Sequence, residues 1–468
     1  MLTITLDKQA PTPLVEQIIS EIRRRIDEHA LRSNTRLPSI RQFATQHRVS
    51  RFTVVQAFDR LVATGYLHSR PGSGFYVSPR PTAHENITSP VQLERAMDTL
   101  WLLRNALTTP RTDLIPGAGW LPHQWMDEDA VQRSLRQLAK HAGSHLTSYG
   151  QPEGYLPLRQ LLQSRLGDIG VAADSRQILL TNGATHALDL IVRYYVRPGD
   201  TVLVDDPGYF ILFGALKSHG AKVVGVPWNT DGPDIESLER LIKEHQPNVF
   251  FTNSILHNPT GASISQAIAY RVLQLAEKYD LVIVEDDVYG DFHPQQQSRL
   301  ATLDQLQRVI YISSYSKTLS AAMRVGYIAG KPELIQQLAD LKLISGLTTA
   351  ELNERLIYQM LTDGYYRKYL DKLHKRLQQE KERAIESFDK IGLSPVIEPQ
   401  GGMFMWIEMP PHIDVVKLVS TAAQQGITLA PGNLFRPHHE PSQGIRFNIA
   451  SCNESKNYAF IKSQINDG

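Results

Sequence analysis

The stretch VIYISSYSKTLSAAMRVGY, residues 309–327, decides how the large part of this chain folds. It opens with a short apolar run rich in β-branched residues, which is typical of a buried strand, and a second apolar run occupies residues 325–329. Between the two runs, Lys317 stands among serines and is followed by Arg324. A lysine beside an apolar strand end can have a lowered pKa and form a Schiff base with an aldehyde, so this stretch indicates chemistry.

The pattern on both sides of this stretch alternates between apolar strands and amphipathic helices. Most of the strands are separated by segments of helix length, and we expect them at residues 178–181, 201–204, 249–252, 281–284, 309–313 and 325–329. This alternation predicts a largely parallel sheet covered on both faces. Long helical stretches follow residue 331 up to about residue 390, and a smaller section of strands and helices ends the chain.

The first 80 residues have a different pattern. Helical spacing of apolar residues predicts one helix from Pro13 to about Leu31, a second from about Pro38 to His47, and a third that begins after Ser50 and ends at Gly65. The stretch YLHSRPGSGFYV, residues 66–77, predicts a hairpin around a Pro-Gly-Ser-Gly turn. Three helices followed by a hairpin make a winged helix-turn-helix.

Composition and charge limit the class of protein. The 468 residues include a single cysteine, Cys452, which excludes an internal disulfide and a cysteine-based metal cluster. No long apolar run and no signal peptide are present, so we expect a soluble, cytoplasmic protein without a membrane segment. Residues 1–80 carry 12 Lys and Arg against 6 Asp and Glu, although the whole chain has a net charge of only +1. Basic charge concentrated at one end of the chain is typical of a nucleic-acid-binding domain, here called the reader domain.

Several polar residues follow the predicted strands directly, where ligands collect in sheets of this kind. The stretch TNGATHAL, residues 181–188, combines a strand end, a glycine and a helix start, and can hold a phosphate. Tyr209 follows another strand, Asn258 lies in the turn HNPTG, and Asp286 and Tyr289 end a strongly apolar strand. Together with Lys317 these residues describe a pyridoxal phosphate site, because that cofactor needs an amine, a carboxylate for its ring nitrogen, donors for its phenolic oxygen and a phosphate cup.

At this point the chain resembles the fold-type I aminotransferases over roughly residues 110–468. The resemblance implies that Lys317 bonds to the cofactor, Asp286 faces the ring nitrogen, and Tyr209 stacks on the ring. It also implies that Asn258 and Tyr289 bond the phenolic oxygen, and that the phosphate is held by Ala184, Thr185, Ser314, Ser316 and Arg324. Arg446, in GIRFNIA, matches the family's carboxylate-binding arginine, and Tyr149, in YGQPEGYLPLR, matches a segment near the active site shared by two subunits.

The N-terminal stretch from Thr35 to Val77 resembles the GntR winged-helix domain. The resemblance and the groove-reading role of the second helix of such motifs imply the DNA-binding residues Arg36, Ser39, Arg41, Ser50, Arg51, Thr53, Gly72 and Gly74. Two departures occur. Ser33-Asn34 replaces a common Pro-Gly, although Asn34 tolerates a left-handed turn, and Arg48 stands where relatives often have glycine.

A GntR reader joined to an aminotransferase-like domain is the organisation of the MocR subfamily of regulators, which this chain resembles end to end. We therefore expect a winged helix-turn-helix at residues 1–79, a linker at 80–110, and an α/β pyridoxal-phosphate domain at 111–468 with a small α+β subdomain from about 335. The resemblance implies a transcription factor that binds double-stranded DNA, senses the cofactor or an amine or amino-acid effector, and forms a head-to-tail, domain-swapped homodimer.

Other interpretations stay open at this stage. Taken singly, Lys317 could be a solvated surface lysine, Asp286 a helix cap, and Arg446 half of a surface ion pair, whereas six matches in the expected order favour the cofactor site. The winged helix could serve protein contacts rather than DNA. The main alternative function is an active aminotransferase, similar to the aminoadipate aminotransferases, with an appended DNA-binding domain, because the lysine, aspartate and arginine are all present.

Overall fold

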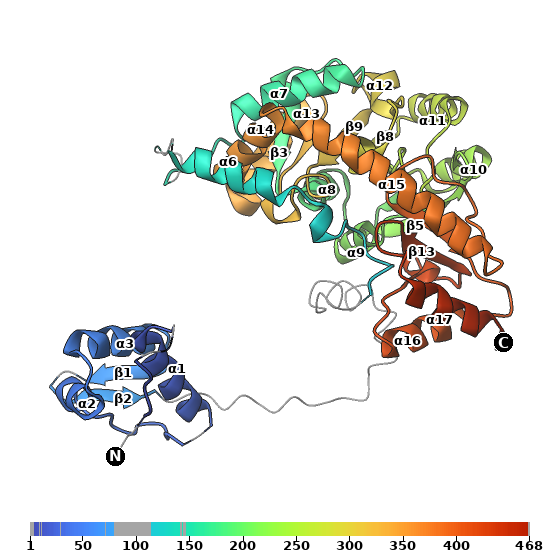
Figure 1. The fold of residues 1–468 in the computed structure, drawn as a ribbon. Helices are drawn as coiled ribbons and strands as arrows, with labels where there is room; N and C mark the ends of the chain where they lie inside the picture. The colour runs from blue at the N-terminus through green and yellow to red at the C-terminus, as the bar shows by residue number, and fades with distance from the viewer. Residues whose placement is uncertain are drawn as a thin grey trace. The chain divides into compact units, whose positions relative to one another are not determined.

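The computed structural model describes residues 4–78, apart from 9, 11, 29 and 71, and residues 114–466, apart from 141, 142 and 144–146. The chain forms two compact units, Met1–Pro90 and Val91–Gly468 (Figure 1). The expected linker at residues 80–110 lies outside the described residues.

The N-terminal unit is the expected winged helix-turn-helix. Its elements are α1 (Leu14–Asp27), α2 (Ile40–His47), α3 (Arg51–Ala63), β1 (Leu67–Arg70) and β2 (Gly74–Val77). The first helix ends at Asp27 rather than near Leu31, and the second starts at Ile40 because Ser39 caps it with a reciprocal hydrogen bond to Gln42. A single apolar cluster built on Phe43 and Phe58 holds the three helices and the hairpin together.

Two residues that depart from the GntR pattern take the left-handed backbone conformation. Arg48 ends α2 with a φ of 51°, and Asn34 has a φ of 63°. The expectation that Asn34 tolerates a left-handed turn is therefore confirmed. Arg48 adopts this conformation despite its side chain, which places a cation in the turn between α2 and α3.

The second unit is built on an eight-stranded sheet of order β3-β10-β9-β8-β7-β4-β5-β6 (Figure 1). The four pairs from β9 to β5 are parallel, whereas β10 runs antiparallel to both of its neighbours. The strands from β9 to β5 therefore form the expected parallel sheet, and antiparallel pairs at both ends, including β6 against β5, make the sheet as a whole mixed. The strands are β3 (Ile178–Thr181), β4 (Thr201–Asp206), β5 (Lys222–Asn229), β6 (Gly232–Pro233), β7 (Val249–Thr252), β8 (Val282–Asp286), β9 (Val309–Ser314) and β10 (Gly326–Ala329).

Helices cover both faces of this sheet, because neighbouring strand residues point to opposite sides. Val309 and Tyr311 pack in a cluster with α7, α10, α11 and α14, while Ile310 and Ile312 pack in another with α8, α9 and α13. The bounds of these helices are α7 (Leu156–Asp168), α8 (Ala184–Tyr195), α9 (Phe210–Ser218), α10 (Ile235–His245), α11 (Gln266–Lys278), α13 (Pro332–Gly346) and α14 (Glu351–Thr362), with α6 (Glu128–Lys140) against α14 and α12 (Leu300–Asp304) against β9.

A smaller section completes this unit. Its three-stranded antiparallel sheet has the order β11 (Phe404–Glu408), β13 (Gly444–Asn448), β12 (Ala430–Pro431), and it packs with α16 (Val415–Gln424) and α17 (Ser455–Asn466). The long helix α15 (Tyr365–Asp389) runs from the large sheet to this section, since Tyr366 belongs to a cluster of the large sheet and Phe388 to the cluster of the small one (Figure 1). Residues of α13 and α14 pack with the large sheet. The buried residues that form the core of the smaller section begin at Ala384, in α15.

Candidate functional site

A cavity lies beyond the carboxyl ends of the central parallel strands. Five of the predicted site residues line it, namely Tyr209, Asn258, Tyr289, Lys317 and Arg446. Asp286 and Tyr209 line an adjoining pocket, so the two pockets share a wall. The topology explains this gathering, because the ends of neighbouring parallel strands meet at one edge of the sheet.

Lys317 is in the turn that follows β9 and is half-buried. Its Nζ donates a hydrogen bond of 2.6 Å to the main-chain oxygen of Gly119. Desolvation lowers the pKa of this lysine to about 8, with further lowering from the positive charges of Arg446 and Arg324. A larger share of this amine is therefore neutral and nucleophilic near neutral pH than for an ordinary lysine.

Asp286 ends β8, and its carboxylate accepts a hydrogen bond of 3.2 Å from the main-chain N–H of Val288. Burial raises the pKa of this carboxyl to about 7. Asn253 anchors the strand end by donating to the main-chain oxygen of Asp286 at 2.6 Å. A protonated nitrogen placed against this carboxylate would restore its charged form, which suits the ring nitrogen of pyridoxal phosphate.

Side chains suited to contact the face and the phenolic oxygen of such a ring also line the cavity. Asn258 Nδ2 lies 3.5 Å from the hydroxyl oxygen of Tyr289, and both residues are buried. Tyr209 precedes α9, and its hydroxyl interacts with the side chain of Thr185 at the start of α8. The hydroxyl of Tyr209 therefore reaches the start of α8.

The predicted phosphate-binding residues lie around the start of α8, which begins at Ala184. Gly183 precedes it with a φ of 78°, and a Cβ there would come within 2.6 Å of the Arg324 guanidinium. Arg324 donates to the hydroxyl of Ser316 at 3.1 Å, and the Ser314 and Ser316 hydroxyls are 3.0 Å apart. A helix start, a guanidinium and two hydroxyls are the groups that a phosphate requires.

Arg446 lies in β13 and is buried, with its guanidinium between the rings of Phe404 and Phe435, at 4.5 and 4.9 Å. It donates to Asn258 Oδ1 and to the main-chain oxygen of Gly117, both at 2.8 Å, while its Nε has no partner. Burial lowers the pKa of this arginine to about 10. Because no carboxylate among the described residues pairs with it, a bound anion is the natural counter-charge.

The structure also shows residues that the sequence did not indicate. The main chain of residues 117–119 lies beside Arg446 and Lys317, and the glycine-rich stretch PGAGW at residues 116–120 is the signal that could have identified it. The remaining walls come from Ile115, Trp120, Phe210, Ile211 and Thr428. In contrast, Tyr149 does not line the cavity, and its side chain is 82% exposed.

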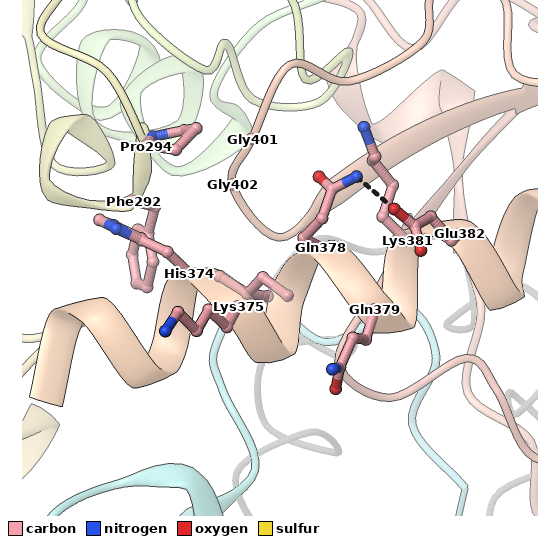
Figure 2. Close-up of a pocket in the computed structure, with 11 residues that line it drawn as sticks. Phe292, Pro294, His374, Lys375, Gln378, Gln379, Lys381, Glu382, Gly401 and Gly402 are labelled. Atoms are coloured by element: carbon pink, nitrogen blue, oxygen red, sulfur yellow. Dashed lines mark hydrogen bonds between the residues drawn. The ribbon is translucent and has the colours of Figure 1, made fainter.

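A larger cavity, of about 420 Å³, lies along the middle of α15 (Figure 2). None of the predicted site residues lines it. Three of its polar side chains are already hydrogen-bonded within the protein: His374 to the Asp291 main-chain oxygen at 2.8 Å, Lys381 to the Pro399 carbonyl at 3.0 Å, and Gln378 to Glu382 at 2.7 Å. Size alone therefore does not locate the chemistry.

In the N-terminal unit, the predicted DNA-binding arginines Arg36, Arg41 and Arg51 are all exposed. Ser50 caps α3 by accepting from the Thr53 N–H at 3.0 Å, and its hydroxyl also lies 2.8 Å from that of Thr53. The caps formed by Ser39 and Ser50 thus fix the starts of both helices of the helix-turn-helix. In the wing, Gly72 and Gly74 both have a positive φ, and a Cβ at Gly72 would meet no atom within 4 Å.

Comparison with known proteins assigns both parts. Residues 119–463 match the family described as aminotransferase class I and II, which is most of the chain. The chain belongs to this family. Residues 14–77 match the family described as bacterial regulatory proteins, gntR family. The predicted likeness to the MocR-type regulators is confirmed, since the chain joins the same two domains in the same order.

Relatives exist in both functional classes. The HTH-type transcriptional regulator YdfD of Bacillus subtilis is 28% identical, with 92% of this chain and 91% of that protein aligned. The 2-aminoadipate transaminase of Thermus thermophilus is 29% identical, with 73% of this chain and 87% of that protein aligned. The solved structure of Pyrococcus horikoshii kynurenine aminotransferase superimposes with a TM-score of 0.73 at 27% identity, covering 82% of this chain and 98% of that one. The transaminase aligns with a smaller share of this chain than the regulator does.

Two further observations concern all the described residues. Within the described part of the chain, no helix combines the length and the apolar character needed to cross a membrane. Among the same residues, no group of three or more His, Cys, Asp and Glu is placed to hold a metal ion. The family supports the predicted cofactor, pyridoxal phosphate, and the residues described above fit it.

Proposed function

We propose that this chain is a transcriptional regulator whose aminotransferase-like domain binds pyridoxal phosphate and an amine or amino-acid effector, and whose N-terminal unit reads double-stranded DNA. The observation that carries the proposal is the charge of the cavity. Two cations, Lys317 and Arg446, line the cavity, and the charge of Arg324 acts on Lys317 from nearby, whereas the carboxylates Asp205 and Asp286 line the adjoining pocket. Such an excess of cations on the cavity side suits a ligand that brings a phosphate and a carboxylate.

The proposed roles follow from these charges. When bound, pyridoxal phosphate supplies an aldehyde that bonds to amines and a ring that withdraws electrons. Lys317 is the amine that tethers it, and Asp286 keeps the ring nitrogen protonated. Asn258 and Tyr289 donate toward the phenolic oxygen, and Tyr209 packs on the ring.

The remaining residues hold anions. The start of α8 at Ala184 and Thr185, together with Ser314, Ser316 and Arg324, binds the phosphate. Arg446 binds the carboxylate of the effector, a task that suits a guanidinium because it offers paired N–H donors. The exposed Tyr149 belongs to the site only if a second subunit covers it. We accordingly propose a homodimer, with each reader domain packed on its partner, located in the cytoplasm where DNA is accessible.

The reader domain binds DNA through α3 in the major groove, with Arg51 at its start, and through the wing at Gly72 and Gly74. Arg36 and Arg41, with the hydroxyls of Ser39, Ser50 and Thr53, contribute phosphate or base contacts. The effector changes operator affinity only if it binds two arrangements of the protein with different strength.

Two measurements on one preparation test this function. The purified chain, incubated with pyridoxal phosphate, should acquire a visible absorption band that borohydride fixes onto residue 317, and the Lys317→Ala variant should not. The same chain should select specific duplexes from a randomised library, with affinity that falls steeply as salt increases. A colourless protein, or affinity that does not change with salt, would refute the proposal.

An active aminotransferase is the second candidate, because Lys317 and Arg446 line the cavity, Asp286 lines the adjoining pocket, and none of the three is in a protein ion pair among the described residues. The two functions differ in turnover. Conversion of an amino acid to its keto acid at more than about one event per second, the lower end of usual enzyme rates, would favour the enzyme.

A further inference from the structure

The walls of the cofactor cavity divide into two groups once the cofactor roles are assigned. Tyr209, Asn258, Tyr289 and Lys317 serve the cofactor, and Arg446 serves a carboxylate, under the proposed function on which this inference rests. What remains for the rest of an effector are Ile115, Trp120, Phe210, Ile211, Thr428 and the main chain of residues 117–119.

Among the described residues of this chain, the remaining wall carries no charged side chain. Lys317 and Arg446 are the only charged residues among those described that line the cavity, and each already has a role. An effector with a second carboxylate would need another cation there, and an effector with a basic side chain would need an acid. A buried charge without a partner is strongly unfavourable, so the part of the wall that this chain supplies disfavours both classes.

We propose that the effector is an α-amino acid with an uncharged, apolar side chain, bound through its carboxylate to Arg446 and through its side chain to the wall formed by Ile115, Trp120, Phe210, Ile211 and Thr428. The class includes amino acids such as leucine, norleucine and phenylalanine. It excludes dicarboxylic and basic amino acids.

The test uses the full chain loaded with pyridoxal phosphate and follows its visible spectrum during titration with amino acids. Three ligands of similar length isolate the effect of charge: L-norleucine, L-glutamine and L-glutamate. We expect L-norleucine to bind tightest and L-glutamate at least about 100-fold more weakly, since an unpaired buried charge costs several kcal/mol. L-Lysine should be excluded to a similar degree.

A variant provides a second readout. Thr428→Arg adds a cation to the wall and should improve L-glutamate relative to L-glutamine by at least about 10-fold, whereas the neutral variant Thr428→Gln should not. Binding of L-glutamate or L-lysine to the natural chain as tightly as L-norleucine would overturn this inference alone. A loaded protein whose spectrum responds to no amino acid would overturn the proposed effector role and the inference with it.

A separate observation concerns the reader domain. Among its described residues, Phe52 is the single large apolar side chain left exposed, at 69%. It follows Arg51 in the first turn of α3, and it lies about 200° around the helix from Val54, which is buried in the core. The domain therefore presents an aromatic ring on the end of the helix that enters the major groove in helix-turn-helix proteins.

We infer that Phe52 packs against the C5-methyl group of a thymine and so reads that base. An apolar side chain distinguishes thymine from other bases through this methyl group. The inference depends on DNA binding by the domain, and the test separates the two. Duplexes are first selected from a randomised library by the full chain. This selection fails only if the chain does not bind specific DNA, and such a failure would remove both the proposed DNA binding and the proposed role of Phe52.

Each thymine of the selected duplex is then replaced by deoxyuridine, which lacks only the methyl group. We expect one replacement to weaken binding about 5-fold or more, the scale of a good base contact. The Phe52→Ala variant should bind the two duplexes equally, whereas Phe52→Leu should keep part of the discrimination. The inference is wrong if no replacement weakens binding by the natural chain. It is also wrong if the Phe52→Ala variant distinguishes the two duplexes as well as the natural chain does.

Discussion

The lowered pKa of Lys317 predicts how the cofactor is captured. At pH 7 a lysine with a pKa of about 8 has about 300-fold more neutral amine than one with the ordinary value of 10.5. Only the neutral amine attacks an aldehyde, so the rate of capture should rise from pH 6 and level off above about pH 8. An ordinary lysine would keep gaining rate up to about pH 10.5.

The assay mixes the cofactor-free chain with pyridoxal phosphate at a series of pH values, quenches with borohydride, and quantifies the adduct on the Lys317 peptide by mass spectrometry. Adducts on surface lysines such as Lys390 provide an internal reference within each sample. The Arg446→Gln variant should move the midpoint upward, because the positive charge of Arg446 contributes to lowering the pKa of Lys317. A rate at Lys317 that still increases between pH 9 and 10.5 would refute the reasoning.

Three further predictions test the two units. Gly183→Ala should weaken cofactor binding at least about 10-fold, because the φ and ψ of Gly183 are strained for other residues and the new Cβ would displace Arg324. The control Gly364→Ala should not weaken binding, since Gly364 has a similar φ but open space around it. Equal effects of the two substitutions would contradict the role of the turn at Gly183. Arg51→Ala should lower the slope of log affinity against log salt by about 1 in an anisotropy assay, and an unchanged slope would exclude a phosphate contact. Phe58→Ala should cost about 3–5 kcal/mol in urea unfolding of the reader domain, and a cost below about 1 kcal/mol would show that this ring is not central to its core.

Much of the fold could be predicted because its patterns are local. The strands at residues 178–181 and 249–252 have the predicted bounds, since each is a continuous apolar run with clear ends. Strand β5 was not predicted, because Gly225 and Pro227 interrupt its apolar run. Its pairing with β4 is a tertiary effect, and spacing within the segment does not report it.

The cofactor site could be predicted because its side chains follow strands directly, and parallel strands bring their ends together. The part of the cavity wall that we propose contacts the effector could not be predicted from the sequence. Phe210 and Ile211 come from the start of a helix, Thr428 from the small section, and Trp120 from a segment about 200 residues before Lys317. These residues meet only after folding, and each is an ordinary apolar or small residue with no motif of its own.

The central claim is that occupancy of the cofactor cavity is relayed to the DNA reader. The most direct measurement is the affinity of the loaded full chain for a selected duplex, with and without a saturating apolar amino acid, and with Arg446→Gln as the variant that should bind the effector poorly. We expect a change of about 5-fold or more in the natural chain and little change in the variant, as is typical of a linked pair of sites. Identical affinity in the natural chain with and without the amino acid, while the spectrum shows that the amino acid has bound, would contradict it.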